Sequence, residues 1–260
     1  MFLVPRFILD HPWLFGVAVL LSLVGIFHLG RALGKSRGLS GDSGVGLIDG
    51  AIFALVGLLL AFTFTSAANR FEVRRDRVVA EANAIGTAQL RLDLLPADVQ
   101  PRARALLDAY VERRLAIFAR IRDLDAAKAE YERSQAIQRE LWALAVTAGR
   151  RPDALPAVNT VLLPALNQMF DIGTERLTEM RFRTPIAVFV LLWGAAMLAT
   201  GMAGHASAAK VERYRPHLLA YSLLLAASLY AIVDLEFPRA GVIRVDSYDA
   251  MLKGEIWPAR

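Results

Sequence analysis

The residues whose types and spacing could do chemistry lie together near the end of one apolar stretch. Phe62, Ser66 and Asn69 follow one another at intervals of four and three residues, so they share one face of a helix. A face that changes from an aromatic ring to a hydroxyl and an amide suits a water-filled path for ions that narrows at the ring. A packed helix whose Ser and Thr hydroxyls bond their own backbone carbonyls accounts for the same residues.

The same stretch carries a stripe of small residues and ends next to charged ones. Small side chains allow membrane helices to approach closely, so the stripe predicts a helix-packing surface; it comprises Gly50, Ala54, Gly57 and Ala61. Arg70 and Arg74 follow Asn69, whereas Asp234 and Glu236 end the last apolar stretch. We expect these four charges at the inner mouth of such a path, where the carboxylates either pair with the arginines or lie solvated at the membrane surface.

Motifs for catalysis and metal binding are absent from the sequence. There is no cysteine, which excludes thiolate nucleophiles and Cys-ligated metals. Glycine-rich phosphate loops, His-Glu-x-x-His zinc motifs and Gly-x-Ser-x-Gly nucleophile elbows are also missing. We therefore predict neither an enzyme nor a resident cofactor or metal.

The elements that must position these residues are membrane helices. The chain is 55% hydrophobic yet 21% charged, and the apolar residues are clustered. Four stretches reach the roughly 20 residues that a bilayer requires: Trp13–Leu33, Leu47–Ala68, Ile186–Ala206 and Leu218–Leu235. Short polar loops join the first two and the last two, which predicts two antiparallel hairpins. The predicted segments are a first hairpin (1–68), a helical domain (69–184), a second hairpin (185–236) and a tail (237–260).

The distribution of Lys and Arg predicts the orientation. The two short loops hold six such residues, Arg31, Lys35, Arg37, Lys210, Arg213 and Arg215, and the opposite side holds ten. Because the cytoplasmic side carries the excess, we expect the helical domain, the tail and both termini to be cytoplasmic, in a bacterial inner membrane. The net charge of +5 follows from this topology, and no pattern typical of nucleic-acid binding is present.

The central region is predicted to be helical almost throughout. Residues 102–148 contain neither Gly nor Pro, and Gly149 is a stop signal. Asp98 before Pro101 is a start signal for this helix. Either one unbroken helix or two helices with a break near Asp123–Ala127 fits the pattern, and a last helix is expected over Leu166–Arg183.

Several segments resemble a bacterial family of bestrophin-like membrane proteins. They are Gly57 to Phe64, the run Arg75 to Leu95 with its Glu81-Ala-Asn-Ala-Ile-Gly86 core, Tyr110-Val111-x-x-Arg114, and Asp234 to Gly241, which follows a Leu-Asp-x-Pro-x-x-Gly pattern. Bestrophins are pentameric ion channels whose second transmembrane helices line the pore. The resemblance implies a homo-oligomer, a pentamer by this analogy, that conducts ions. The acidic calcium-binding segment of bestrophins has no match here.

These observations favour an all-α membrane protein that forms an oligomeric ion channel lined by the second apolar helix. Two alternatives remain open. A proton-driven channel of the flagellar-stator type has the same order of spans but needs a partner helix with an acidic residue. A non-conducting sensor or scaffold would use the helical domain to bind a cytosolic partner.

Overall fold

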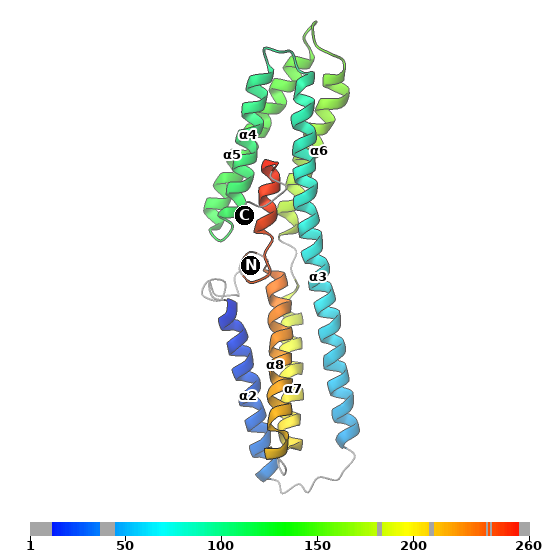
Figure 1. The fold of residues 1–260 in the computed structure, drawn as a ribbon, viewed down its shortest axis with the longest axis vertical. Helices are drawn as coiled ribbons and strands as arrows, with labels where there is room; N and C mark the ends of the chain where they lie inside the picture. Colours follow the sequence, from blue (N-terminus) through cyan, green and yellow to red (C-terminus); the bar gives the residue numbers. More distant parts are fainter. Residues whose placement is uncertain are drawn as a thin grey trace. The chain divides into compact units, whose positions relative to one another are not determined.

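A computed structural model of the chain describes residues 12–36, 45–180, 184–207, 211–237, 239 and 241–254. Every regular element among these residues is a helix, as Figure 1 shows, which confirms the predicted all-α fold. The elements are α2 (Pro12–Ser36), α3 (Val45–Arg91), η1 (Leu92–Leu94), α4 (Gln100–Ala119), α5 (Leu124–Gly149), η2 (Val158–Leu162), α6 (Leu163–Glu179), α7 (Ile186–Ala206), α8 (Val211–Glu236) and η3 (Asp246–Lys253).

The chain forms two compact units. The first comprises residues 1–72 and 183–244, and the second comprises residues 73–182 and 245–260. Helix α3 contributes its first part to one unit and the remainder to the other. It continues past the predicted end at Ala68 because neither Gly nor Pro interrupts residues 58–85. The four predicted domain segments, which would divide this helix after residue 68, remain a prediction.

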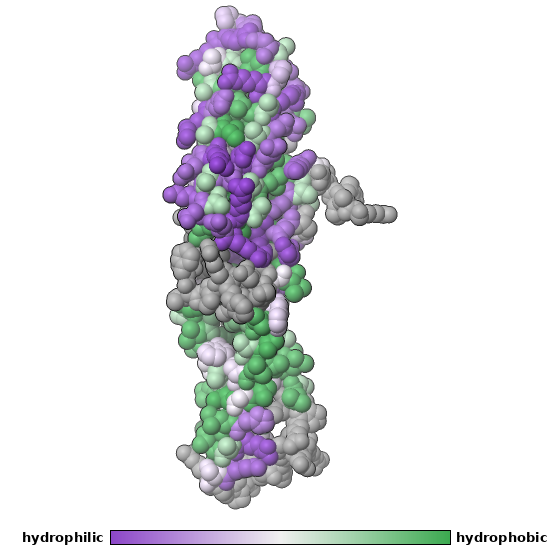
Figure 2. Space-filling model, turned by 90° about the vertical axis from the view of Figure 1, so that its left-hand side faces the viewer, coloured by the Kyte–Doolittle hydropathy of each residue, from purple (hydrophilic) through white to green (hydrophobic). Residues whose placement is uncertain are grey.

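Four helices are long and apolar enough to cross a membrane: Trp13–Ser36, Ile48–Leu94, Ile186–Ala206 and Leu219–Glu236. The four predicted apolar helices are therefore confirmed, and their pairing in two hairpins stays a prediction. Large apolar side chains of the first unit are exposed, among them Leu21, Val190 and Leu224. Figure 2 shows hydrophobic residues covering most of the visible surface of this unit, whereas hydrophilic residues dominate the second unit. An apolar outer surface is what lipid requires of a membrane bundle.

Glycines bring α2 and α7 into backbone contact in the first unit. A Cβ atom on Gly30 would collide with the carbonyl of Gly201, and one on Gly204 would collide with the carbonyl of Phe27. Small residues at such crossings let membrane helices gain close van der Waals contact, which lipid cannot replace. The core beside this crossing contains the fully buried Leu23, Leu192, Ala196, Ala199 and Ile232. The sequence analysis did not identify this packing site.

The second unit contains the antiparallel helices α4 and α5 together with α6 and η3. Of the two alternatives for the central helix, the one with a break is confirmed: the chain turns at residues 120–123, and Asp123 caps α5 by accepting the Ala126 N–H at 3.2 Å. Helix α4 begins at Gln100, beside the predicted start signal of Asp98 before Pro101, but Val99 occupies the N-cap position and Asp98 instead pairs with Arg151 at 2.7 Å. Helix α5 ends at Gly149 as predicted. The last helix of the central region, α6, begins at Leu163 after a π-helical turn.

Candidate pore helix and its charge partners

Helix α3 packs within the first unit through one face only. Val56 and Ala67 are buried in the core, and Ile52, Leu59 and Phe71 pack against it while partly exposed. These positions recur at steps of three, four and eight residues, so they form one stripe along the helix. Only 11% of the most apolar window of α3 is buried, against 22–44% for the other three apolar helices. The remaining surface of this apolar part of α3 is uncovered in the protomer.

The predicted pore-lining face and the predicted small-residue stripe both lie on this uncovered part of α3. Phe62 is 64% exposed, and Ser66 and Asn69 are exposed beside it. The small-residue stripe is exposed as well, and a Cβ atom on Gly50 or Gly57 would meet no atom within 4 Å. The stripe therefore makes no close contact within the protomer. Its predicted role in packing stays a prediction, as does the pore-lining role of Phe62, Ser66 and Asn69.

One hydroxyl of α3 bonds a backbone carbonyl of its own helix, as the packed-helix alternative predicts. The Thr63 Oγ1 donates to the Leu59 carbonyl at 2.7 Å, one turn earlier in the same helix. Among the residues that the structure describes, Ser66 has no such partner. Its hydroxyl lies on an exposed face of an apolar helix, where lipid would offer it no hydrogen bond.

Arg70 and Glu236 are brought together as the sequence analysis allowed. The Arg70 Nε donates to the Glu236 Oε1 at 2.7 Å, and its Nη2 donates to the same oxygen. Thr184, which no sequence pattern identified, accepts from Arg70 and donates to Glu236 Oε1 at 2.6 Å. The Glu236 side chain is 1% exposed and that of Arg70 30%. This triad ties α3 to α8 and to the residues before α7, and it compensates the charge of Arg70.

Asp234 has a structural role and, among the residues that the structure describes, no arginine partner. Its carboxylate accepts the backbone N–H groups of Val242, at 3.0 and 3.1 Å, and of Ile243, at 2.8 Å. A Cβ atom on Gly241 would overlap this carboxylate, so only glycine permits the approach. The spacing from Asp234 to Gly241 thus forms a cap for the turn after α8. Arg74, the fourth predicted charge, belongs to the second unit and is buried, with 8% exposure.

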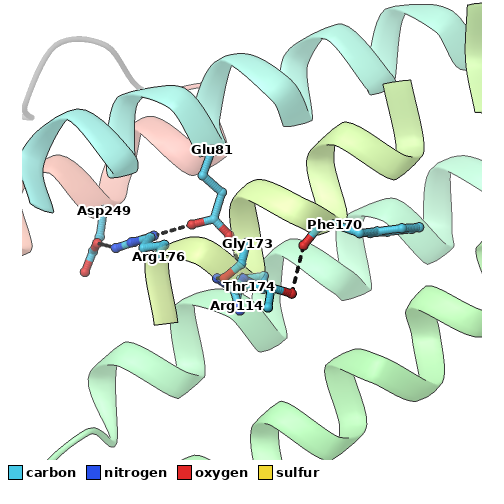
Figure 3. A network of polar contacts seen from close by, with 7 residues as sticks. All are labelled: Glu81, Arg114, Phe170, Gly173, Thr174, Arg176 and Asp249. Carbon is cyan, nitrogen blue, oxygen red and sulfur yellow. Dashed lines mark hydrogen bonds and ion pairs between the residues drawn. The ribbon is translucent and has the colours of Figure 1, made fainter. Parts of the chain in front are cut away.

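A buried ion network in the second unit was missed by the sequence analysis. Glu81 of α3 accepts from Arg114 of α4 at 2.6 Å and from Arg176 of α6 at 2.7 Å. Arg176 also donates to Asp249 of η3 at 2.5 Å, and Arg114 donates to the Gly173 carbonyl at 2.7 Å. Figure 3 shows Glu81 between Arg114 and Arg176, and Asp249 of η3 on the far side of Arg176. Glu81 and Arg114 both lie in segments that carried the family resemblance, which was the available signal.

Burial and charge shift the pKa values around this network. Burial raises the pKa of Tyr110, which packs edge-on against Phe170, to about 12. Burial disfavours the charged form of Arg114, but the charge of Glu81, its hydrogen bond and the nearby Tyr110 and Tyr131 together outweigh burial and raise the pKa of Arg114. The guanidinium of Arg176 lies 3.7 Å from the centre of the Phe118 ring. Arg114 is therefore held as a cation, and the network is a structural support of the unit.

A second carboxylate of this unit gathers arginines at its surface. The Glu130 side chain is 1% exposed and contacts Arg113 at 3.2 Å, Arg133 at 2.8 Å and Arg120. Burial alone would raise the pKa of Glu130, but the hydrogen bond from Arg113 and the three positive charges lower it.

No group of three or more His, Cys, Asp or Glu side chains that could hold a metal ion occurs among the described residues.

The sequence matches the bestrophin-like domain over residues 16–249. The chain belongs to the bestrophin-like family. A bestrophin homologue from Klebsiella pneumoniae has a TM-score of 0.70 at 16% identity, covering 93% of this chain and 94% of that chain. A single-residue variant of that homologue gives 0.71 at 16% identity, with coverages of 92% and 93%.

A further crystal structure, described only as a membrane protein, gives a TM-score of 0.66 at 17% identity and covers 93% of this chain and 94% of that chain. No curated protein matches the sequence. At these identities the likeness concerns the fold, and it extends over nearly the whole bestrophin-like chain. The resemblance predicted from the sequence segments is confirmed.

Proposed function

We propose that this bestrophin-like protein is a homo-oligomeric ion channel whose α3 helices line the conduction path. The observation that carries the proposal is the uncovered state of α3, whose most apolar window is only 11% buried in the protomer. Its exposed surface includes Ser66 and Asn69, whose polar groups lipid would leave without partners. A water-filled path would solvate them.

The faces of α3 suit a position in a ring of subunits. At 100° per residue, the packed face with Val56, the small-residue stripe and the Phe62 face are separated by roughly 120° each. A helix that lines a ring needs three surfaces, toward its own protomer, toward a neighbouring copy and toward the axis. The stripe provides the surface for the neighbour, because small residues permit close approach of membrane helices. Family resemblance favours five copies.

The proposed setting is a bacterial inner membrane with both termini and the second unit on the cytoplasmic side. This orientation rests on the Lys and Arg asymmetry of the sequence. The partners are then the lipid bilayer, further copies of the chain and the permeating ions. No catalytic role or cofactor is part of the proposal.

Substitution of Phe62 tests the conduction path. Phe62 side chains from the several copies would form an apolar constriction around the axis, and such a constriction blocks ions because it excludes water. Phe62→Ala should therefore raise ion flux in reconstituted liposomes. If the ring adds about 1.4 kcal/mol to the barrier, the increase is about tenfold. Ser66→Arg on the same face should shift the ion preference toward anions.

Phe64→Ala is the matched control, because Phe64 is exposed on a different face of the same helix. It should leave the flux and the ion preference nearly unchanged. If neither the native protein nor Phe62→Ala conducts above empty liposomes in several salts, the channel proposal fails. A sensor or scaffold built on the helical second unit would then account better for the fold.

A further inference from the structure

The arginines around Glu130 come from three parts of the hairpin that α4 and α5 form. Arg113 lies on α4, Arg120 directly follows α4, and Arg133 lies on α5. Arg120 and Arg133 donate to Oε1 of the carboxylate, the latter at 2.8 Å. Arg113 donates to Oε2 at 3.2 Å. Because the Glu130 side chain is only 1% exposed, a buried carboxylate holds three guanidinium groups together at the surface of the second unit.

Within the described part of the chain, most hydrogen-bond donors of these three arginines have no protein partner. Each arginine contacts Glu130 through a single nitrogen, Nη1, whereas a guanidinium group carries several further N–H donors. No other side-chain partner of the three arginines occurs among the residues that the structure describes. The side chains of Arg113, Arg120 and Arg133 are 39%, 53% and 59% exposed. A ligand from the solvent can therefore reach the remaining donors.

The same cluster carries more positive than negative charge. Three guanidinium groups meet one carboxylate, and three minus one leaves a surplus of two positive charges. Held this close together, the guanidinium groups repel one another. A further anion in contact with them would reduce this repulsion and would accept hydrogen bonds from the remaining donors.

The other carboxylates of the hairpin do not cancel this surplus. Asp125 and Glu132 lie about 140° and 160° around α5 from Glu130, so they belong to another face of that helix. On α4, Glu112 lies about 100° around the helix from the arginine of the cluster. Asp123 shares the face of Glu130, but it lies in the turn and caps α5. Even with Asp123 counted, the face carries three positive charges and two negative ones.

We propose that Arg113, Arg120 and Arg133 bind a terminal phosphate group. Such a group carries more than one negative charge and several acceptor oxygens, so it can accept from two or three guanidinium groups at once. The planar fork of an arginine also matches the spacing of two phosphate oxygens. The phosphate group belongs either to a soluble compound or to the headgroup of an anionic lipid, and both offer the same chemistry to the cluster. Phosphate binding here does not require the chain to conduct ions.

Isothermal titration calorimetry of the full-length protein in detergent tests the soluble source, with inorganic pyrophosphate as the probe. If the source is soluble, the native protein should bind pyrophosphate, and Arg133→Gln or Arg113→Gln should weaken binding at least about tenfold, because a charge-assisted contact is lost. Each variant leaves Glu130 with two arginine partners, so the hairpin stays paired. Arg102→Gln is the matched control, because it removes the same charge from an exposed arginine of α4. It should leave binding unchanged.

Native mass spectrometry of the same four proteins tests the lipid source, with phosphatidic acid as the probe and phosphatidylcholine as the control lipid. If a lipid supplies the phosphate, the native protein and Arg102→Gln should retain more phosphatidic acid per protomer than Arg113→Gln and Arg133→Gln. Phosphatidylcholine should not distinguish the four proteins. A loss confined to the two cluster variants in either experiment supports the site and identifies the source. If neither probe separates these two variants from Arg102→Gln, the inference is overturned.

Discussion

The buried network around Glu81 allows a quantitative test of what stabilises the second unit. Glu81 is fully buried, and the side chains of its partners Arg114 and Arg176 are 2% and 4% exposed. Glu81→Gln keeps the shape of the side chain but removes the carboxylate that both arginines share. Arg176 then keeps only Asp249 as a charged partner, and Arg114 keeps none of the carboxylates in this network. Removing one partner of a buried ion pair costs about 3–5 kcal/mol, because the remaining charge stays desolvated. For a unit of this size, such a loss lowers the unfolding midpoint by about 10 °C.

The assay is thermal unfolding of the full chain in detergent, followed by circular dichroism at 222 nm. Glu175→Gln serves as the control, since it breaks the ion pair with Arg77, whose side chains are 50% and 37% exposed. Exposed pairs contribute about 0–1 kcal/mol, so its midpoint should fall by no more than about 3 °C. Equal shifts for the two variants would refute the reasoning that burial makes the Glu81 network important.

Two further predictions concern packing and pH. Gly57→Leu should reduce the mass of the oligomer in detergent while the protomer stays folded, because a Cβ atom on Gly57 meets no atom of the protomer. Gly204→Leu, in contrast, should unfold the protomer, because a Cβ atom on Gly204 collides with the Phe27 carbonyl. An unchanged oligomer mass for Gly57→Leu would remove the stripe from the subunit contact. Because the pKa of Glu130 is lowered in the folded state, its ionised form stabilises that state at pH values above the ordinary pKa of 4.5. This contribution to stability is lost as the pH falls through the folded-state pKa. The difference in unfolding midpoint between the native protein and Glu130→Gln should therefore shrink from pH 7 to pH 3, and a constant difference would contradict the assignment.

The features that the sequence predicted well depend on local patterns. Continuous apolar stretches identify membrane helices because the bilayer sets their length. The break before α5 was one of two options, and Asp123 decides it by capping the new helix. Helix α5 ends at Gly149, the predicted stop signal, with Arg150 at its C-cap position. The family resemblance also rested on short runs of sequence, and the match over residues 16–249 confirms it.

The features that the sequence did not predict depend on contacts between distant residues. Asp98 has the residue type of a helix cap, but Arg151, 53 residues later, provides a charged partner that competes for its carboxylate. The crossing of Gly30 with Gly201 joins segments that no periodicity relates. The network of Glu81 likewise collects arginines 33 and 95 residues away. Residue type showed that these groups need partners, and only the fold identifies the partners.

The charges that follow Asn69 illustrate the same limit at the candidate site. Residues 70–77 hold four arginines, Arg70, Arg74, Arg75 and Arg77, interleaved with Glu72 and Asp76, so the sequence alone does not identify which of these charges are exposed. A helix distributes them over different faces, because residues two positions apart lie about 200° apart around its axis. Burial then distinguishes the faces: Arg74 is 8% exposed, whereas Glu72 is exposed. The exposure of each charge thus depends on which face of α3 packs within its own unit, and in the first unit that face contains Val56 and Ala67.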